Sequence, residues 1–318
     1  MALQVAIQMD PVETIRVNAD STFVLALEAA RRGHALFHYL PRDLSLNGER
    51  VTARARPMTV RRDGGPPAIL GEPRVLDLSS MDVVLMRQDP PFDMAYISAT
   101  HMLEHLRPDT LVVNDPVAVR NAPEKLYAAH FSGLMPPTLI TADRQAMAEF
   151  RAEHRDIIVK PLYGNGGAGV FHVGPDDENF AALIEMFTAQ SNEPLVIQRY
   201  LPRIREGDKR IILIDGEPAG AVMRVPAHGE ARSNLHVGGT ATKATLDHRD
   251  EVICEALGPS LREQGLVFVG IDVIGGFLTE INVTSPTGLQ EVNRFDGVCL
   301  EARIWDVIER RLQDRAAA

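Results

Sequence analysis

The spacing of short apolar runs divides this chain into two parts. Runs of strand length occupy residues 5–9, 35–40, 81–86 and 111–113. Helical stretches lie between them, one near residues 21–32 with Asp20 as N-cap and Gly33 just past its end, and one near residues 95–106. This alternation of strand and helix predicts a parallel α/β layer over about residues 1–120.

The rest of the chain has a different pattern, in which tight glycine turns join paired strands. Short strands are expected at residues 157–159, 170–173 and 195–200, with a helix near 177–190. Hairpins are expected to turn at Asp215-Gly216 and at Gly275-Gly276. Long helices are expected near residues 247–264 and 300–312, and the polar, Gly-rich stretch 226–241 predicts a mobile loop.

Length, charge and cysteine usage narrow the class of protein. A chain of 318 residues predicts two or three domains. The formal net charge of −10 argues against a nucleic-acid partner. No apolar run is long enough for a membrane span and the first residues do not resemble a signal peptide. The two cysteines, Cys254 and Cys299, form no CxxC pair, so we expect a cytoplasmic protein without structural zinc.

A glycine-rich loop follows Lys160-Pro161. Residues 164–169 match GxGxxG, but a dinucleotide fingerprint must open a helix, and the residues that follow, 170–173, are strand-like. No Gly-Lys-Ser/Thr follows, which excludes a Walker loop. Glycines let backbone amides approach phosphate oxygens, and the lysine adds positive charge. The segment therefore predicts a hairpin-type loop lying over nucleotide phosphates; the alternative is an ordinary flexible β-turn.

Three oxygen-bearing side chains, Asp272, Glu280 and Asn282, interrupt the apolar strands of the hairpin at residues 267–283. Glu280 and Asn282 share one face because side chains alternate along a strand. Asp272 joins them only if the connecting loop has an odd number of residues; a two-residue Gly-Gly turn would place it on the opposite face. Two carboxylates and an amide oxygen suit Mg²⁺. The alternative is an edge hairpin with exposed polar residues.

Basic residues in the middle of the chain have two possible roles. Arg210 and Arg224 stand in apolar strands, where an arginine suits bidentate binding of phosphate or carboxylate. Lys125 stands in an expected helix. The alternative for each arginine is a surface salt bridge, and the alternative for Lys125 is a solvated surface lysine. The connector Gln198-Arg199-Tyr200-Leu201-Pro202 ends a strand and could present backbone groups and apolar surface to an adenine.

The segment His101-Met102-Leu103-Glu104-His105 matches the inverted zinc-protease signature HxxEH. Its histidines share a helical face, which makes zinc geometrically possible. Nothing near it in the sequence supplies a third ligand. We interpret both histidines as surface or interdomain residues.

The motifs occur in a recognisable order. They are Met9-Asp10-Pro11, Arg87-Gln88-Asp89-Pro90-Pro91-Phe92-Asp93, Asn114-Asp115-Pro116, Glu124-Lys125-Leu126, Lys160-Pro161-Leu162, Gly207-Asp208-Lys209-Arg210, Gly270-Ile271-Asp272 and Glu280-Ile281-Asn282-Val283-Thr284-Ser285-Pro286-Thr287. Along nearly its whole length the chain resembles bacterial glutathione synthetases, which are ATP-grasp ligases. The second and last of these motifs are the most specific to that family.

The resemblance implies an α/β ATP-grasp fold in three domains: an N-terminal α/β domain (1–122), a small central α+β domain (123–202) and a hairpin-rich C-terminal domain (203–318). It implies ATP contacts from Lys125, Lys160, Gly164, Gly166, Gly167, Gln198, Tyr200, Leu201 and Asp208. Asp272, Glu280 and Asn282 would hold two Mg²⁺ ions, with Mn²⁺ as a substitute. Arg210 and Arg224 would be catalytic. Arg87, Asp89, Arg232, Ser285, Pro286 and Thr287 would contact the peptide or glycine.

The function implied is ligation of γ-glutamylcysteine and glycine through an acyl phosphate, by a cytoplasmic homo-oligomer, expected to be a tetramer. Another ATP-grasp carboxylate–amine ligase is the nearest alternative, and the 87–93 stretch argues against it. A non-catalytic ATP-binding protein is opposed by the intact set of Asp272, Glu280 and Asn282. A nicotinamide dehydrogenase would rest on Gly164–Gly169 alone.

Overall fold

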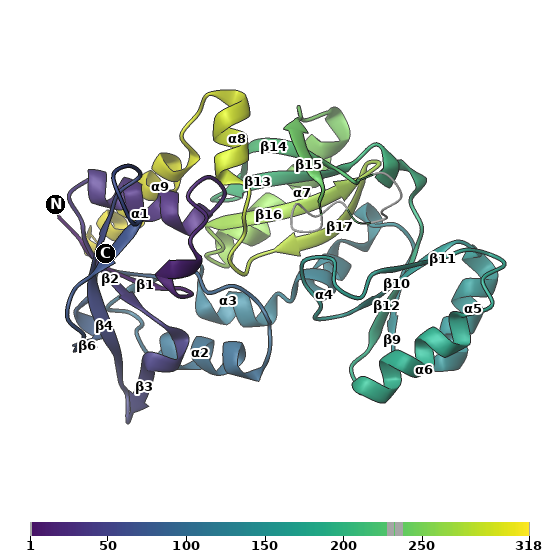
Figure 1. Cartoon of the computed structure of the whole chain (residues 1–318), viewed down its shortest axis with the longest axis horizontal. Helices are drawn as coiled ribbons and strands as arrows, with labels where there is room; N and C mark the ends of the chain where they lie inside the picture. The colour runs from purple at the N-terminus through teal and green to yellow at the C-terminus, as the bar shows by residue number, and fades with distance from the viewer. Residues whose placement is uncertain (1, 228–231, 233–237, 318) are drawn as a thin grey trace.

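The computed structural model describes residues 2–227, 232 and 238–317, and it contains three sheets with helices packed around them (Figure 1). Most of the predicted mobile loop, residues 228–231 and 233–237, lies outside the described residues. Among those described, no helix combines the length and apolar character that a membrane span requires.

The first sheet has the order β3-β4-β2-β1-β7-β8, with β5 and β6 also paired to β4. Its strands are β1 (Gln4–Gln8), β2 (Ala35–Tyr39), β3 (Leu44–Asn47), β4 (Arg50–Val60), β5 (Ala68–Leu70), β6 (Arg74–Asp77), β7 (Val83–Met86) and β8 (Leu111–Val113). The four expected strands are confirmed, and they pair in parallel as β2-β1-β7-β8.

The expectation of a parallel layer throughout residues 1–120 is wrong for residues 44–77. Strand β4 pairs antiparallel with β2, β3, β5 and β6. In β4 the buried positions Val51, Ala53 and Ala55 alternate with polar residues, and Pro57 follows. Alanine buries little area and favours strands weakly, so the sequence pattern of β4 predicts a strand only weakly.

Side-chain caps fix where the helices of this region begin. Asp20 accepts a hydrogen bond from the Phe23 amide at 2.9 Å, and Asp93 accepts one from the Tyr96 amide at 2.9 Å. Each satisfies a donor that the first helical turn would otherwise leave without a partner. The helices are α1 (Ser21–Arg31), α2 (Met94–Glu104) and α3 (Pro116–Asn121).

A four-stranded antiparallel sheet, β11-β10-β12-β9, forms the middle of the chain. Its elements are β9 (Thr138–Thr141), α5 (Arg144–His154), β10 (Ile157–Pro161), β11 (Phe171–Val173), α6 (Phe180–Gln190) and β12 (Leu195–Arg199). Strand β9 and helix α5 were not expected from the sequence. These elements share a hydrophobic cluster of their own, which includes Met147, Ile157 and Ile184.

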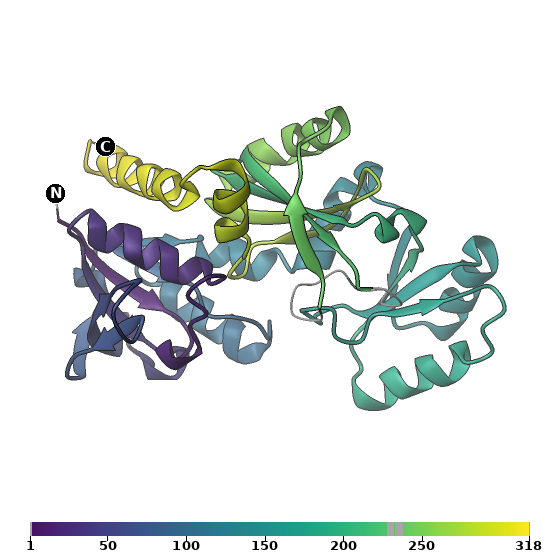
Figure 2. The same ribbon diagram turned by 45° about the horizontal axis from the view of Figure 1, so that its top comes forward.

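The third sheet is antiparallel, with the order β15-β14-β13-β16-β17 (Figure 2). Its elements are β13 (Asp208–Ile214), β14 (Glu217–Val225), β15 (Thr240–Lys243), α7 (His248–Glu263), β16 (Phe268–Ile274), β17 (Phe277–Asn282), α8 (Leu289–Asp296) and α9 (Leu300–Ala317). Helix α4 (Glu124–Ala128) packs against β17 although it precedes β9 in the chain. The expected hairpins and both long helices are confirmed.

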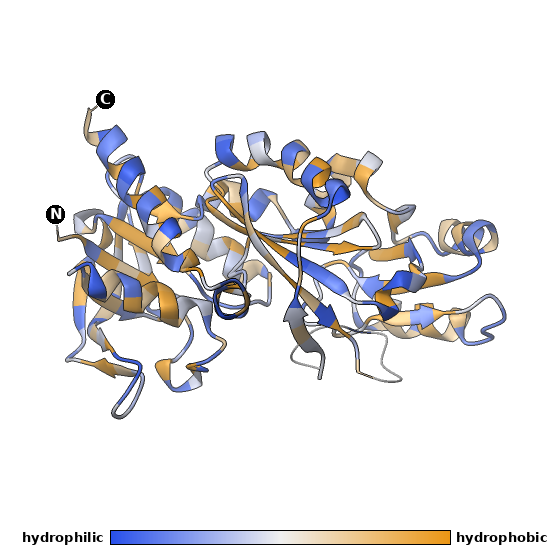
Figure 3. Cartoon of the chain, turned by 90° about the horizontal axis from the view of Figure 1, so that it is seen from above, coloured by the Kyte–Doolittle hydropathy of each residue, from blue (hydrophilic) through white to orange (hydrophobic). Residues whose placement is uncertain are grey.

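The first and third sheets share their cores, whereas the middle sheet does not share in them. Two hydrophobic clusters each combine residues 3–135 with residues from 211 onward, and apolar strands run through the interior in Figure 3. Helix α9 packs on α1, where the buried Trp305 donates its indole N–H to the Leu25 carbonyl at 2.9 Å. Burial of this apolar area stabilises the junction, by about 25 cal/mol per Å².

Asn114 fastens β8 to the third sheet. Its side-chain amide donates to the carbonyls of Phe268 at 2.7 Å and Val283 at 3.0 Å, and its oxygen accepts from the Phe268 amide at 2.9 Å. One buried side chain therefore satisfies three backbone groups of β16 and of the residue after β17. This contact sets the position of the N-terminal sheet relative to the 272–282 hairpin.

Candidate active site

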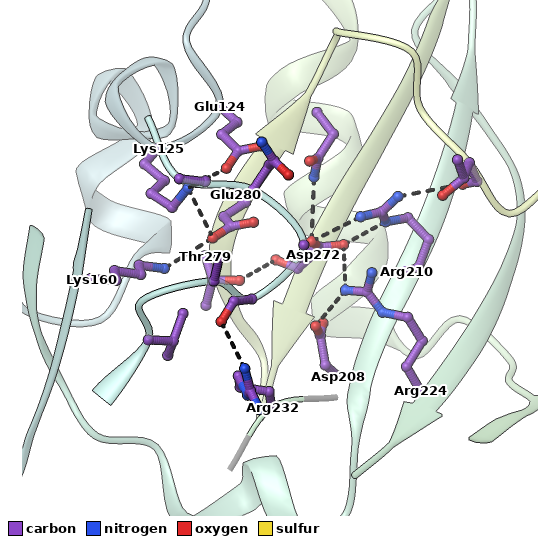
Figure 4. Close-up of a pocket in the computed structure, with 18 of the residues that line it drawn as sticks. Glu124, Lys125, Lys160, Asp208, Arg210, Arg224, Arg232, Asp272, Thr279 and Glu280 are labelled. Carbon is purple, nitrogen blue, oxygen red and sulfur yellow. Dashed lines mark hydrogen bonds and ion pairs between the residues drawn. The ribbon is translucent and has the colours of Figure 1, made fainter. Parts of the chain in front are cut away.

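A cavity of about 590 Å³ lies where residues of all three sheets approach one another. Seven of the residues that line it are lysine or arginine and six are aspartate or glutamate. In a chain with a net charge of −10, this gathers cations in one place. The carboxylates pair with several of these cations, so anionic ligands entering the cavity would meet groups that are already held in position (Figure 4).

The hairpin β16–β17 brings Asp272, Glu280 and Asn282 to one face. The expected odd-length loop is wrong, because the turn at Gly275-Gly276 has two residues. A β-bulge produces the convergence instead: Asp272 pairs with Glu280 and Val273 with Leu278, which leaves Thr279 as the extra residue. The Thr279 hydroxyl donates to the Asp272 carbonyl at 3.0 Å. A bulge of this kind re-aims the side chains that follow it.

Two arginines hold the Asp272 carboxylate, which is buried. Strand register places Arg210 opposite Asp272, and the guanidinium binds both carboxylate oxygens, at 2.5 and 3.0 Å. Arg224 lies 2.9 Å from the same carboxylate, and the Asn282 amide donates to it at 3.3 Å. Burial opposes ionisation, but Arg210 and Arg224 outweigh it and hold the pKa of Asp272 well below its usual range.

Two lysines surround Glu280. The Lys160 ammonium lies 3.1 Å from its carboxylate, and the Lys125 ammonium lies 3.8 Å from it. Burial alone would raise the pKa of Glu280, but the two lysines lower it. Lys125 also pairs with Glu124 and donates to the Gly164 carbonyl at 2.5 Å. Although burial opposes it, the attraction of Glu280 and Glu124 raises the pKa of Lys125, which therefore stays charged.

The chemistry of this hairpin fits a hard divalent cation. Its donors are two carboxylates and one amide oxygen, all from one face. Within the described part of the chain, no three His, Cys, Asp or Glu side chains gather into a metal-binding cluster. Mg²⁺ characteristically binds one or two carboxylates and completes its octahedral shell with phosphate oxygens and water. Asp272, Glu280 and Asn282 fit that pattern better than they fit an all-protein cage.

The glycine loop joins antiparallel strands β10 and β11, so it does not open a helix. Its Gly164, Gly166 and Gly167 line the cavity, as predicted. Gly166 and Gly167 have φ values of 61° and 82°, which L side chains rarely adopt. The Arg232 guanidinium donates to the Gly167 carbonyl at 3.5 Å, which brings the one described residue of the 228–237 segment to the same wall.

The connector after β12 forms another wall. Gln198, Tyr200 and Leu201 all line the cavity. The Gln198 side chain is buried and donates to the Thr138 hydroxyl at 2.8 Å. The Tyr200 ring stacks on His172 with centroids 4.0 Å apart, and His172 lies 2.6 Å from the Asp156 carboxylate. This wall combines aromatic, aliphatic and backbone surface, which suits a flat base.

Asp208 lines the cavity but is also the ion-pair partner of Arg224. The register of β13 and β14 places the two residues opposite each other. A carboxylate with two oxygens can accept from an arginine and from a sugar hydroxyl together. The ion pair is therefore compatible with the ribose contact that the resemblance implied.

The loop 284–288 follows β17 and forms the wall next to the N-terminal sheet. Ser285, Pro286 and Thr287 line the cavity, and Ser285 has a φ of 42°. Backbone strain of this kind persists where surrounding contacts hold it. Here the Ser285 hydroxyl donates to the Arg87 carbonyl at 3.1 Å, and the Arg87 guanidinium donates to the Pro286 carbonyl at 2.9 Å.

Arg87 and Asp89 differ in their access to the cavity. Asp89 lines it, whereas Arg87 is buried behind the wall and donates to the Thr22 hydroxyl at 3.0 Å as well as to Pro286. Arg87 is not among the described residues that line the cavity. Its geometry favours a role in holding the 284–288 loop over direct contact with a substrate.

Several cavity residues were not singled out from the sequence. They include Arg16, Ala19, Asn165, Ile204, Thr279 and Glu291; Pro90, Glu124, Arg199 and Thr284 stand in the motifs given above but were assigned no role. The sequence around Arg16 contains no motif that would predict a position in a functional site. His101 on α2 and His105 just after its end are exposed, and Glu104 pairs with Arg120, so the surface interpretation of the HxxEH segment is confirmed.

Glu124 should make the stability of the ligand-free protein depend on pH. Burial, together with Glu280, raises the pKa of Glu124 to about 7, although Lys125 opposes the rise. The folded state therefore holds this proton more tightly than the unfolded state. The contribution of Glu124 to stability should be fully present below the unfolded pKa near 4.5 and should be lost as pH rises from there to about 7.

Chemical denaturation across this pH range, without Mg²⁺ or nucleotide, measures the effect. Glu124→Gln should flatten the decline, whereas Glu255→Gln, at an exposed position on α7, should keep the wild-type profile. An identical profile in Glu124→Gln would show that the buried carboxyl does not titrate in this window.

Comparison with known proteins identifies the family to which the chain belongs. A family model described as prokaryotic glutathione synthetase, N-terminal domain, matches residues 3–120. One described as prokaryotic glutathione synthetase, ATP-grasp domain, matches residues 124–297. Among solved structures, D-cycloserine synthetase DcsG aligns with a TM-score of 0.67 at 18% identity, over 96% of this chain and 99% of that one. At that identity the likeness establishes the ATP-grasp fold alone.

Curated relatives are similar over almost the full chain. A glutathione synthetase of Mesorhizobium japonicum is 57% identical over 97% of this chain and 99% of its own. One from Brucella melitensis is 56% identical over 98% and 100%, and one from Yersinia pestis is 42% identical over 99% and 100%. The cavity, the fold and these matches agree: the chain belongs to the prokaryotic glutathione synthetase family.

Proposed function

We propose that this chain ligates γ-glutamylcysteine to glycine at the expense of ATP, forming glutathione, ADP and phosphate. One observation supports it most: Asp272 and Glu280 meet across a bulged hairpin, one between two arginines and the other between two lysines. Preorganised charge of this kind, next to the glycine loop whose Gly164 carbonyl accepts from Lys125, supports a site for phosphates and a carboxylate.

The first half of the reaction joins two anions. An oxygen of the cysteine carboxylate attacks the γ-phosphorus, the bond to the ADP oxygen breaks, and an acyl phosphate forms. Lys125, Lys160 and the loop amides would hold the phosphates, and Arg210 would neutralise charge on the transferring group. Divalent cations held by Asp272, Glu280 and Asn282 would supply further charge neutralisation.

In the second half the neutral glycine amine attacks the carbonyl carbon. A C–N bond forms, the amine loses a proton and phosphate leaves. Arg210 and Arg224 lie side by side at Asp272, in position to stabilise the oxyanion and the departing phosphate. Positioning and charge stabilisation carry both halves, so the site requires no nucleophilic side chain.

The remaining assignments complete this proposal. Gln198, Tyr200 and Leu201 would hold adenine and Asp208 the ribose, while Asp89, Arg232, Ser285, Pro286 and Thr287 would face the acid and amine substrates. The three sheets support division into domains 1–122, 123–202 and 203–318. We further propose two Mg²⁺ ions, replaceable by Mn²⁺, and a cytoplasmic homotetramer. Metal titration of activity and sedimentation analysis test the ion requirement and the oligomeric state.

Release of ADP tests the function directly. Purified protein with ATP and Mg²⁺ should release ADP rapidly when γ-glutamylcysteine and glycine are both present, and mass spectrometry should find one glutathione for each ADP. A panel of other acids and amines serves as the comparison. Faster ADP release with a different acid–amine pair would assign the chain another ligase activity.

Lys160→Ala should raise the KM for ATP by at least about tenfold, equivalent to roughly 1.4 kcal/mol of lost binding. The buried ammonium stands beside Glu280 and below the glycine loop, where the phosphates are proposed to lie. Initial rates at varied ATP measure the change, and Lys243→Ala, at an exposed lysine on β15, is the control. Unchanged KM and kcat in Lys160→Ala would remove this residue from the ATP site.

A further inference from the structure

A second cavity, of about 40 Å³, lies at the junction of the first and third sheets. Its wall is formed by the segment around β8 (residues 107–116), by Gly265 and Val267 just before β16, and by one face of α9. Among the described residues, it shares none with the wall of the candidate active site. One water occupies about 10–15 Å³ on this measure, so the space suits a ligand the size of roughly three waters.

Three arginines line the second cavity, Arg107 from the segment before β8 and Arg311 and Arg315 from α9. Positions 311 and 315 are one helical turn apart, so a single face of α9 presents both side chains. Gly265 allows the close approach of the two sides: a Cβ there would lie 3.2 Å from the Asp115 Cβ and 3.7 Å from an Arg311 guanidinium nitrogen. The chain as a whole has a formal charge of −10, so this positive charge is a local feature.

The carboxylates next to these arginines are already paired. Asp115, which lines the second cavity, pairs with Arg107 and also accepts two backbone N–H groups of the first turn of α3, each at 3.0 Å. Asp215 lies 2.5 Å from Arg311 and 2.7 Å from Arg310, so one carboxylate is shared by two arginines. Neither carboxylate has charge left over for a further cation.

Arg315 differs from the other two arginines because no carboxylate of the described chain forms an ion pair with it. Burial and the charges of Arg107 and Arg311 lower the pKa of Arg315. A guanidinium stays protonated in proteins, so the second cavity keeps a positive charge that the described side chains do not balance. The Arg107 side chain is 43% exposed, which leaves the cavity open to an ion from solvent.

We propose that the second cavity binds an oxyanion of the phosphate class between the guanidinium groups of Arg107, Arg311 and Arg315. The planar N–H fork of a guanidinium matches two oxygens of such an ion. Each guanidinium has five N–H donors, so Arg107 and Arg311 have donors beyond those that their carboxylates use. The ion would connect the segment before β8 to α9 across the junction of the two sheets, and its binding would stabilise the folded chain.

Thermal denaturation at increasing inorganic phosphate tests this site, with ionic strength held constant by NaCl and without Mg²⁺ or nucleotide. At about ten times the dissociation constant, bound phosphate should raise the Tm of wild type by about 2 °C. Arg315→Gln should lose this rise, because it removes the arginine without a partner and leaves no carboxylate unpaired. Arg315→Lys, which keeps the charge, should retain part of it. Arg303→Gln, at an exposed position of α9 outside the cavity, should behave as wild type.

Phosphate can also enter the candidate active site, and Lys160→Ala separates the two contributions. The part of the rise that Arg315→Gln removes should persist in Lys160→Ala, whose substitution lies in the other cavity. A parallel titration with ribose 5-phosphate distinguishes the source of the oxyanion. Tighter binding of the ester would assign a phosphate ester to the site, and tighter binding of inorganic phosphate would assign the free ion; each result supports the site.

An equal rise of Tm in wild type and Arg315→Gln would overturn the inference. So would an equal rise when chloride replaces phosphate at the same ionic strength, because that would show general screening of charge. Neither result bears on the proposed function, which is tested separately by ADP release with γ-glutamylcysteine and glycine. Arg315→Gln should keep the wild-type rate in that assay.

Discussion

Replacing Glu280 with glutamine is expected to lower kcat by about 10²- to 10³-fold, the range found when one preorganised charge contact is removed from an active site. The amide keeps the size of the side chain but removes the charge that faces Lys125 and Lys160. It also removes one of the two carboxylates proposed to hold Mg²⁺. In a Mg²⁺ titration the variant should therefore be less active than wild type at every concentration, and its activity should saturate at a higher Mg²⁺ concentration.

The fold should survive this change, because Glu280 is partly exposed to the cavity and Lys125 keeps its pairing with Glu124. Circular dichroism and Tm measure that separately from turnover. Glu217→Gln, at an exposed glutamate on β14 of the same sheet, is the matched control and should retain full activity. Wild-type turnover and Mg²⁺ dependence in Glu280→Gln would show that the residue is structural.

Asn114→Ala is expected to lower the free energy of unfolding by at least about 3 kcal/mol, since each of three buried polar groups left without a partner costs roughly 1–3 kcal/mol. The substitution removes the partner of the Phe268 amide, the Phe268 carbonyl and the Val283 carbonyl at once. These groups belong to the hairpin that carries the site, so kcat should fall as well when the hairpin loses its attachment to β8.

Urea denaturation monitored by the fluorescence of Trp305 gives the change in stability, because this single tryptophan is buried at the α1–α9 junction. Asn121→Ala, at the exposed end of α3, should change stability by less than about 0.5 kcal/mol, as is usual for surface substitutions. A similarly small effect in Asn114→Ala would mean that water or a backbone shift satisfies the three groups.

Local patterns in the sequence located much of the site. Lysine before a glycine loop, and carboxylates interrupting apolar strands, depend on the residue types and on spacings of a few positions. That is why Lys160, Asp272, Glu280 and Asn282 were identified and why the structure brings them together around one cavity. The helix cap at Asp20 was predicted for the same reason, since a cap acts within one turn.

The weak points of the sequence interpretation were features set by distant partners. Strand β4 has an alternating but weakly apolar sequence, and its place in the sheet depends on pairing with β2. Strands β3, β5 and β6 depend in turn on pairing with β4. Arg87 stands in a motif typical of the family, yet the fold buries it behind the cavity wall. Arg16 has no distinguishing neighbours, and only the meeting of the three sheets brings it to the cavity.

The sequence by itself determined which residues could bind phosphate and a hard cation, because that chemistry resides in side-chain type and short-range order. Tertiary structure alone decided how they converge. The two-residue turn at Gly275-Gly276 would have separated Asp272 from Glu280, and the bulge at Thr279 reverses that outcome. The physical reason is the two-residue period of a strand: one unpaired residue exchanges the faces, and whether it is present depends on the hydrogen-bonded partner strand.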